Sequence, residues 1–234
     1  MEADVWENVW GKDLIVSDYS LKYLRFISEI EKDLKSGSKV IEVGSGTGQT
    51  LSIFSKRHAT TGFDISKNAL LLSRKNCHCP IRGNLLEMPF KDESFDFVYN
   101  SGVIEHFKEP FNIQGISEMC RITKKGGHIL IIVPNSLCVW YRIYKFILSS
   151  FDRFEFGYEE DYSIWRLRNS IKSTNYQFDV ISEFGLQSLV PLATNDKEIC
   201  SESVRRKIGN IEKYFPNFIA KYIAYAIGIY ITKL

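Results

Sequence analysis

Residues 40–50, VIEVGSGTGQT, carry the pattern that decides the fold. A short, mostly apolar run leads directly into three glycines at alternate positions, Gly44, Gly46 and Gly48, and helical spacing of apolar residues resumes after Thr50. Glycine is used where the backbone needs a positive φ or where another group approaches it closely. At the carboxyl end of a strand, just before a helix, both uses indicate a nucleotide-like ligand in the adjoining crevice.

Length and charge limit the class of protein. A chain of 234 residues that is 44% hydrophobic can build one substantial core, so we expect a single domain. Thirty basic residues against 28 acidic ones leave a net charge of +2 without a basic stripe, so no nucleic-acid partner is expected. The N-terminal sequence MEADVWENVWGKD lacks the features of a secretory signal, which predicts a cytoplasmic protein.

Strands and helices alternate on either side of the glycine turn. Helical spacing is found at residues 17–34, 67–75 and 111–121, and strands are expected at TTGFDIS, PIRGN, FDFVYNSG and GGHILIIVPN. We interpret Gly126 and Gly127 as a tight turn ahead of the last of these strands. Alternation of helices with largely apolar strands predicts an α/β fold with a doubly wound, Rossmann-like parallel sheet.

The composition changes after Pro134. Residues 137–165 contain ten aromatic side chains. Apolar residues at helical spacing predict an amphipathic helix over residues 137–148, followed by an irregular aromatic loop. An insertion after the carboxyl end of a strand lies on the ligand-binding side of an open α/β sheet. A packed subdomain without a ligand role is the alternative.

The last residues, FIAKYIAYAIGIYITKL, resemble a membrane segment at first sight. Lys221 interrupts them, and the uninterrupted part is about half of the roughly 20 residues that span a bilayer. We expect no transmembrane segment, but a helix from about Pro216 followed by a buried strand over residues 225–232. Peripheral membrane contact, through this helix or the aromatic insertion, stays open as an alternative.

Two acidic residues frame the glycine turn. Glu42 directly precedes it, where a carboxylate would repel a diphosphate and favour a ligand that carries an ammonium group. Gln49 stands where a dinucleotide fingerprint has its third glycine. Asp64 lies twenty residues beyond Gly44, at the end of the next strand, where a carboxylate accepts hydrogen bonds from a ribose. The expected ligand therefore carries a ribose and no diphosphate.

Four segments in this order resemble the class I S-adenosylmethionine-dependent methyltransferases, in the branch that includes small-molecule, quinone and glycolipid methyltransferases. They are VIEVGSGTGQT, GFDIS, GNLLEMPFKDESFDFVYNSGVIEHF and EMCRITKKGGHILIIVPN. The resemblance covers residues 39–134 closely and the remainder in outline. It implies a seven-stranded, mostly parallel sheet with an antiparallel last strand and an aromatic helical insertion after the fifth strand.

The resemblance also implies the reaction and the division of the chain. S-adenosylmethionine would be the cofactor and S-adenosylhomocysteine the product, with a small-molecule or lipid-like acceptor. Residues 1–234 would form one methyltransferase domain. Its parts would be an N-terminal lid and helix (1–36), a cofactor-binding core (37–135), a substrate-cap insertion (136–175), and a C-terminal helix and strands that complete the sheet (176–234).

Carried over by position, the resemblance implies which residues contact the cofactor. The glycine turn would surround its amino acid part, the end of the second strand its ribose, the loop after the third strand its adenine, and the end of the fourth strand its sulfonium. These residues are Glu42, Gly44, Ser45, Gly46, Gly48, Asp64, Ile65, Asn84, Leu85, Asn100 and Ser101.

Residues for the acceptor are predicted beside the cofactor site. An oxygen or nitrogen acceptor must lose a proton, and His106 is the candidate general base, although it could instead orient a loop or cap a helix. Trp6 and Trp10 are interpreted either as a lid over the cofactor or as a staple for the N-terminus. The aromatic insertion supplies the candidate substrate contacts, Trp140, Tyr144, Tyr158 and Tyr162.

Three further interpretations were weighed. A non-catalytic, cofactor-binding regulatory domain is an alternative from a different functional class. A nicotinamide-dependent oxidoreductase is disfavoured by Gln49 and Glu42. The cysteines of NCHCP, residues 76–80, are interpreted as ordinary reduced thiols rather than as metal ligands, and no metal is expected.

Overall fold

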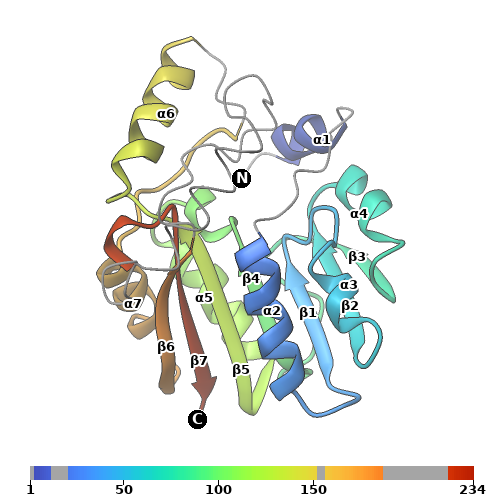
Figure 1. Ribbon diagram of the computed structural model, residues 1–234. Coiled ribbons are helices and arrows are strands. Elements are labelled where there is room, and N and C mark those ends of the chain that lie inside the picture. The colour runs from blue at the N-terminus through green and yellow to red at the C-terminus, as the bar shows by residue number, and fades with distance from the viewer. Residues whose placement is uncertain (1–2, 12–20, 152–155, 187–220) are drawn as a thin grey trace.

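The computed structural model describes residues 3–11, 21–151, 156–186 and 221–234. Its short apolar strands form a seven-stranded sheet in the order β3-β2-β1-β4-β5-β7-β6 (Figure 1). The first five strands are parallel, and β7 runs antiparallel to both β5 and β6. This sheet confirms the predicted fold class. The strands are β1 (Lys39–Val43), β2 (Ala59–Asp64), β3 (Cys79–Arg82), β4 (Phe95–Ser101), β5 (Thr123–Pro134), β6 (Phe178–Leu186) and β7 (Ala226–Lys233).

Helices cover both faces of the sheet. On one face, α2 and α3 pack over a cluster that includes Ile27, Phe54 and Phe97. On the other face, α5 and α7 pack over a larger cluster that includes Ile116 and Leu167. Helices within the described residues include α1 (Ala3–Gly11), α2 (Leu21–Asp33), α3 (Leu51–Phe54), α4 (Lys67–Ser73), α5 (Phe111–Ile122), α6 (Val139–Ser150) and α7 (Ile164–Lys172), together with the 3₁₀ turn η1 (Ile104–His106).

Gly126 and Gly127 lie inside the fifth strand, whereas the sequence analysis predicted them ahead of it. Strand β5 begins at Thr123, which pairs with Phe95, and His128 already pairs with Phe97. The residues between them form a bulge inside the strand, where Gly126 has a φ of +71°. The prediction of a turn ahead of the strand was therefore wrong, because pairing with β4 continues on both sides of the glycines.

The C-terminal segment and the aromatic insertion agree with their predicted elements. Strand β7 is the expected final strand, whereas the helix expected from Pro216 begins outside the described residues. Helix α6 follows β5 as the amphipathic helix of the insertion. Among the described residues, no helix is long and apolar enough to cross a membrane.

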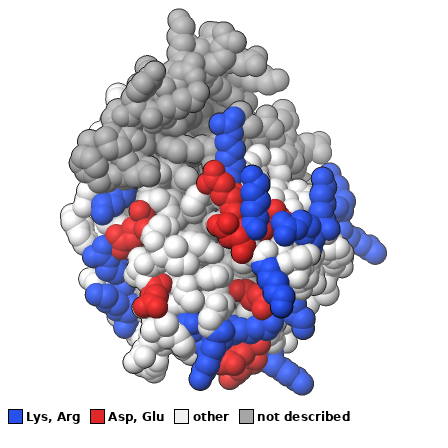
Figure 2. Space-filling model, turned by 60° about the horizontal axis from the view of Figure 1, so that its bottom comes forward, with Lys and Arg blue, Asp and Glu red and all other residues white. Residues whose placement is uncertain are grey.

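Charges of both signs are interspersed on the face formed at the amino ends of the parallel strands (Figure 2). Asp96 illustrates the mixing, because its carboxylate accepts hydrogen bonds from Lys124 Nζ at 2.6 Å and from the Lys39 backbone at 2.8 Å. This face therefore has no single-sign field that would attract a polyanion.

Candidate functional site

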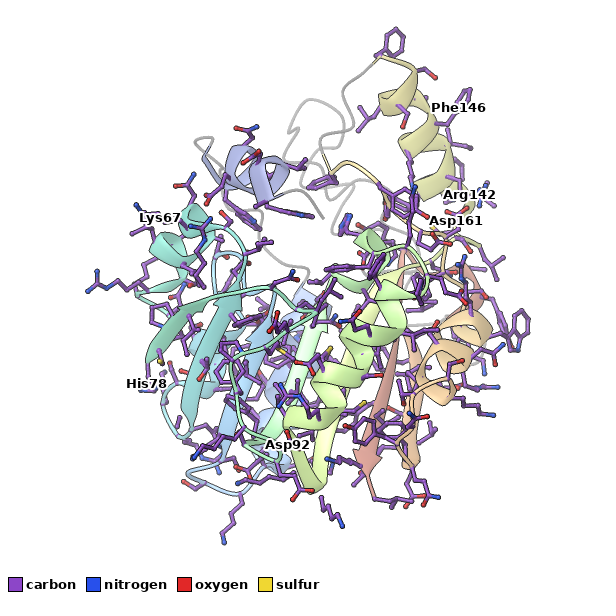
Figure 3. The ribbon with its side chains drawn as sticks, turned by 180° about the vertical axis from the view of Figure 1, so that it is seen from behind. Lys67, His78, Asp92, Arg142, Phe146 and Asp161 are labelled. Carbon is purple, nitrogen blue, oxygen red and sulfur yellow. The ribbon has the colours of Figure 1, made fainter. Side chains whose placement is uncertain are left out.

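A pocket lies at the carboxyl ends of β1, β2 and β4, with an empty volume of about 630 Å³ that includes open solvent. Helix α1 lies at this same end of the sheet (Figures 1 and 3). The lining is mostly apolar with a few polar groups, and consists of Trp6, Trp10, Val43, Gly44, Gly46, Phe63, Asp64, Ile65, Gly83, Asn84, Leu85, Ser101, Gly102, Val103 and Phe107.

Most of the residues predicted to contact the cofactor line this pocket, but four do not. Seven of the eleven belong to the lining: Gly44, Gly46, Asp64, Ile65, Asn84, Leu85 and Ser101. The other four, Glu42, Ser45, Gly48 and Asn100, lie behind or beside it. Gly48, for example, faces α4, because a Cβ there would lie 2.9 Å from the Cβ of Ser73.

Two glycines of the turn allow close packing around the pocket. Gly44 has a φ of +72°, and an added Cβ would lie 2.3 Å from Val103 Cγ2. Gly46 has a φ of +49°, and an added Cβ would lie 2.7 Å from the Trp10 ring. Val103 and Trp10 both line the pocket. The glycines are therefore required by the backbone conformation and by the side chains that form the pocket walls.

Asp64 joins the glycine turn to the start of α4. Its Oδ2 accepts a hydrogen bond from the Gly46 backbone at 2.9 Å, and its Oδ1 accepts one from the Ser66 backbone at 2.9 Å. Burial raises the pKa of this carboxyl, against the lowering effect of the backbone donors. Each carboxylate oxygen has a second lone pair, so Asp64 can still accept a hydrogen bond from a ligand hydroxyl in the pocket.

Glu42 turns away from the pocket, into the face of the sheet covered by α2 and α3. Its Oε1 accepts a hydrogen bond from Thr50 Oγ1 at 2.6 Å, while its Oε2 is buried without a partner among the described residues. Burial raises its pKa to about 8. Asn100 is also fully buried, and neither end of its side-chain amide has a partner there. Polar groups left unsatisfied behind the glycine turn and at the end of β4 are compatible with a polar ligand nearby.

The N-terminal helix is held over the pocket by one carboxylate. Glu7 accepts hydrogen bonds from the backbone of Lys67 at 2.8 Å and of Asn68 at 3.1 Å, and from Ser66 Oγ at 2.9 Å. These donors form the first turn of α4, and they lower the pKa of Glu7. Arg82 adds an ion pair at 3.2 Å. These contacts attach α1 to the domain, and both interpretations of Trp6 and Trp10, as a lid and as a staple, stay predictions.

His106 lies beside the pocket rather than in its lining. Its ring meets Trp6 edge to face, with centroids 4.8 Å apart. Its Nδ1 lies 2.7 Å from the carbonyl oxygen of Tyr158, so Nδ1 carries the proton and Nε2 keeps its lone pair. Burial lowers the pKa of His106 to about 4, which makes the ring neutral at physiological pH. The adjacent Glu105 is buried, and burial raises its pKa well above the usual range.

Of the four predicted substrate residues, the three whose side chains the structure describes do not line the pocket. Trp140 is exposed, and Tyr158 is exposed beside Lys108. Tyr162 is fully buried in the core, and its hydroxyl accepts a hydrogen bond from Asn112 at 2.7 Å. The side chain of Tyr144 lies outside the described part of the structure. A role in acceptor binding stays a prediction for all four.

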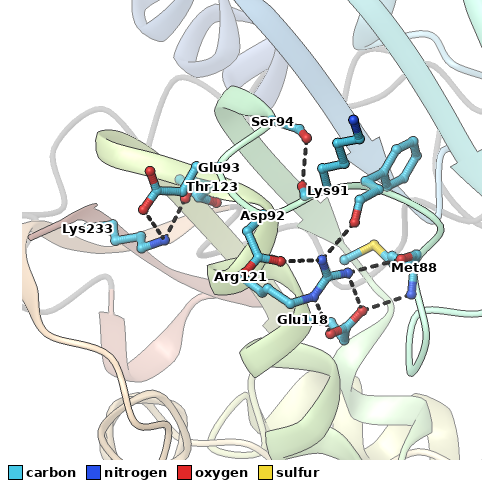
Figure 4. Close-up of polar contacts among 10 residues, drawn as sticks. Met88, Lys91, Asp92, Glu93, Ser94, Glu118, Arg121, Thr123 and Lys233 are labelled. Atoms are coloured by element: carbon cyan, nitrogen blue, oxygen red, sulfur yellow. Dashed lines mark hydrogen bonds and ion pairs between the residues drawn. The ribbon is translucent and has the colours of Figure 1, made fainter.

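The loop that carries Asn84 and Leu85 is fastened to α5 by Arg121 (Figure 4). Arg121 binds Glu118 with two hydrogen bonds of 2.7 and 2.8 Å, and donates to the carbonyl oxygens of Met88 and Phe90. Glu118 in turn accepts from the Met88 backbone at 2.8 Å. The network sets the position of the loop, a contribution that no local sequence pattern indicates.

Comparison with known proteins gives the pocket a family context. A family model described as "Methyltransferase domain" matches residues 41–131. A human protein named "Probable tRNA methyltransferase 9B" is 34% identical over 119 residues, which are 50% of this chain and 26% of that protein. The phosphatidylethanolamine N-methyltransferase of Cereibacter sphaeroides is 35% identical over 104 residues, covering 41% of this chain and 50% of that protein. The chain thus spans between a quarter and a half of these two relatives.

The fold comparison extends over the whole chain. A solved structure from Thermotoga maritima, described as a SAM-dependent methyltransferase and possible histamine N-methyltransferase, aligns with a TM-score of 0.65. It covers 99% of both chains at 19% sequence identity. The two proteins therefore share a fold.

Removing the Glu7 carboxylate should loosen α1. We expect Glu7→Gln to raise the rate of amide hydrogen exchange in residues 3–11 about tenfold, because charge-assisted hydrogen bonds to α4 are lost. Asp4→Asn is the matched control, since Asp4 is exposed on the same helix. Equal exchange in wild-type protein and Glu7→Gln, measured by mass spectrometry, would show that Glu7 does not hold the helix.

Removing the Arg121 guanidinium should destabilise the loop after β3. We expect Arg121→Met to lower the free energy of unfolding in urea by about 2 kcal/mol, because Glu118 and two carbonyl groups lose their donor. Lys91→Met, in an exposed position of the same loop, should change it little. A loss no larger than that of the control would contradict the assigned role.

Proposed function

We propose that the protein is an S-adenosylmethionine-dependent methyltransferase that methylates a small-molecule or lipid-like acceptor. The match of a family model described as "Methyltransferase domain" to residues 41–131 supports this proposal. The observation that carries the proposal is the pocket at the carboxyl ends of β1, β2 and β4, where Asp64 and the Gly44–Gly46 turn meet. This is the place where open α/β sheets bind their ligands.

The chemistry of the pocket suits the proposed cofactor. Asp64 can accept from ribose hydroxyls, while Phe63, Ile65 and Leu85 offer apolar surface to a purine ring. Glu42 faces away from the pocket toward Thr50, so its predicted contact with the amino acid part of the cofactor stays a prediction. When bound, S-adenosylmethionine supplies a methyl group on a sulfonium. The residues around it contribute placement and exclusion of water.

Helix α1 would enclose the cofactor in this proposal. Trp6 and Trp10 line the pocket from α1, and Glu7 ties the helix to α4. Opening of α1 would then admit and release the cofactor, and its closure would remove water from the reacting groups.

His106 is the proposed general base for an acceptor that must lose a proton. Its Nδ1–H donates to the Tyr158 carbonyl, so Nε2 has the free lone pair, and the ring packs on Trp6 at the pocket. A lowered pKa keeps this lone pair available at neutral pH. It also makes the base weak, which suits an acceptor that becomes acidic as its bond to the methyl group forms.

A nucleic-acid acceptor is the second candidate. It is favoured by the match to the human protein named as a probable tRNA methyltransferase. The match covers about half of this chain and a quarter of that protein. On the face shown in Figure 2, acidic and basic side chains are interspersed, so this face has no continuous basic surface that would bind a nucleic-acid backbone. A screen for the acceptor should therefore include both lipid extracts and total tRNA, each with a labelled methyl donor.

Cofactor binding tests the proposal directly. We expect calorimetric titration to give micromolar binding of S-adenosylmethionine and S-adenosylhomocysteine, no binding of NAD, and at least tenfold weaker binding in Asp64→Asn, because a ribose acceptor is lost. Asp179→Asn is the control, since Asp179 is exposed on β6. Binding of NAD alone would favour an oxidoreductase. Cofactor binding without methyl transfer to any acceptor would favour a regulatory domain.

The protonation state of His106 gives a separate test. We expect its imidazole to titrate near pH 4 by NMR, with the proton on Nδ1, and the acidic limb of the methyl-transfer rate to have the same midpoint. His106→Asn identifies the resonance and should lower the rate by about 10² to 10⁴. An imidazole midpoint that differs from that of the rate, or an unchanged rate in His106→Asn, would remove His106 as the base.

A further inference from the structure

Helix α6 presents a continuous apolar face to solvent. Its outer face, as we name it, consists of side chains that are between 47% and 73% exposed: Val139, Trp140, Ile143, Phe146, Ile147 and, just beyond the helix, Phe151. The helical residues follow the spacing i, i+1, i+4, i+7 and i+8, so they lie on one side of the helix. Scattered exposed apolar residues are ordinary, but a contiguous apolar stripe marks an interaction surface.

The opposite side of α6 is already fastened to the domain. The Tyr141 hydroxyl donates to Glu159 at 2.5 Å, and its ring packs edge to face on Tyr225 with centroids 5.0 Å apart. Lys145 Nζ lies 3.1 Å from the same Glu159 carboxylate, which is almost fully buried. These contacts fix the rotation of the helix, so the outer face cannot turn inward without breaking them.

The projecting position of α6 favours a membrane surface as its partner over a protein with a binding groove. Helix α6 projects from the domain beyond the carboxyl ends of the strands, with Phe146 on its outer part (Figures 1 and 3). A bilayer interface accommodates a projecting helix without any complementary groove. At twelve residues α6 is about 18 Å long, which is too short to span a bilayer and suited to lying in its plane.

An exposed cation, Arg142, lies at the edge of the outer face, whereas Lys145 is paired with the buried Glu159 carboxylate. Residues 135–151 contain two basic residues, Arg142 and Lys145, and no acidic ones. Neither lies in the outer face. Arg142 is adjacent to Phe146 on the helix surface and is itself exposed, with a 3.4 Å ion pair to the exposed Asp161. A cation at the edge of an apolar face can reach lipid phosphates while the face enters the acyl boundary. Trp140 suits the same interface.

We propose that the outer face of α6 docks in the plane of a lipid bilayer that contains anionic headgroups. The pocket and α6 lie at the same end of the sheet, so docking would turn that end toward the membrane. The proposal concerns a surface and does not depend on methyl transfer, although it would bring a lipid-like acceptor close to the pocket.

Vesicle flotation tests the proposal. We expect the full chain to float with vesicles of phosphatidylcholine and phosphatidylglycerol, and Ile143→Ser/Phe146→Ser to bind at least tenfold more weakly. Leu71→Ser/Val180→Ser is the matched control, because these residues are comparably exposed on other elements and should leave binding unchanged. Arg142→Gln should reduce the preference for phosphatidylglycerol over phosphatidylcholine alone. Far-UV circular dichroism and thermal unfolding verify that each variant folds.

Tryptophan fluorescence provides a second measurement, which does not require the serine substitutions. We expect vesicles to shift the emission to shorter wavelength, and Trp140→Phe to remove that shift. The proposal is overturned if the chain does not float, or if floating is insensitive to Ile143→Ser/Phe146→Ser. It is also overturned if light scattering shows a dimer that this double variant abolishes, because a second copy of the chain would then cover the outer face. Cofactor titration of the same variants separates either failure from a failure of the proposed reaction.

Discussion

The candidate site depends on two backbone hydrogen bonds that the Asp64 carboxylate accepts. One oxygen binds the backbone of the glycine turn after β1, and the other binds the backbone at the start of α4. Two loops from neighbouring strands are thereby held at a fixed separation at the carboxyl end of the sheet. Burial of a carboxylate raises the free energy of the folded state unless hydrogen-bond donors satisfy it. The hydrogen bonds that shape the pocket therefore also offset the free-energy cost of burying Asp64.

The pocket is completed by segments that have no part in the sheet. Helix α1 covers it because Glu7 caps the first turn of α4, and the Asn84 loop forms one wall because Arg121 fastens it to α5. Both are charge-assisted contacts between elements far apart in the chain. A site built in this way has a rigid base of strand ends and a cover held by side-chain contacts, among them those of the Glu7 carboxylate and of Trp6.

The aromatic insertion has two faces with different roles. Two tyrosines of the insertion pack against the domain. Tyr141 contacts Glu159 and Tyr225. Tyr162 lies in the core beside Asn112. The apolar residues of the outer face of α6 point to solvent. Aromatic content alone therefore does not identify a substrate cap, because the same residue types stabilise the insertion and form its exposed surface. Their division follows from the rotation of α6 about its axis.

The sequence by itself determined the α/β architecture, the glycine turn and most of the pocket residues on the strand ends, because these follow from local periodicity, from positive φ values and from the alternation of strands with helices. Only the tertiary structure decided which side chains face the pocket. Val43 lines it, so the period of two in a strand turns Glu42 to the opposite face, toward Thr50. The bulge at Gly126, the contact of Glu7 with α4 and the outward face of α6 likewise depend on partners distant in sequence, which no local pattern specifies.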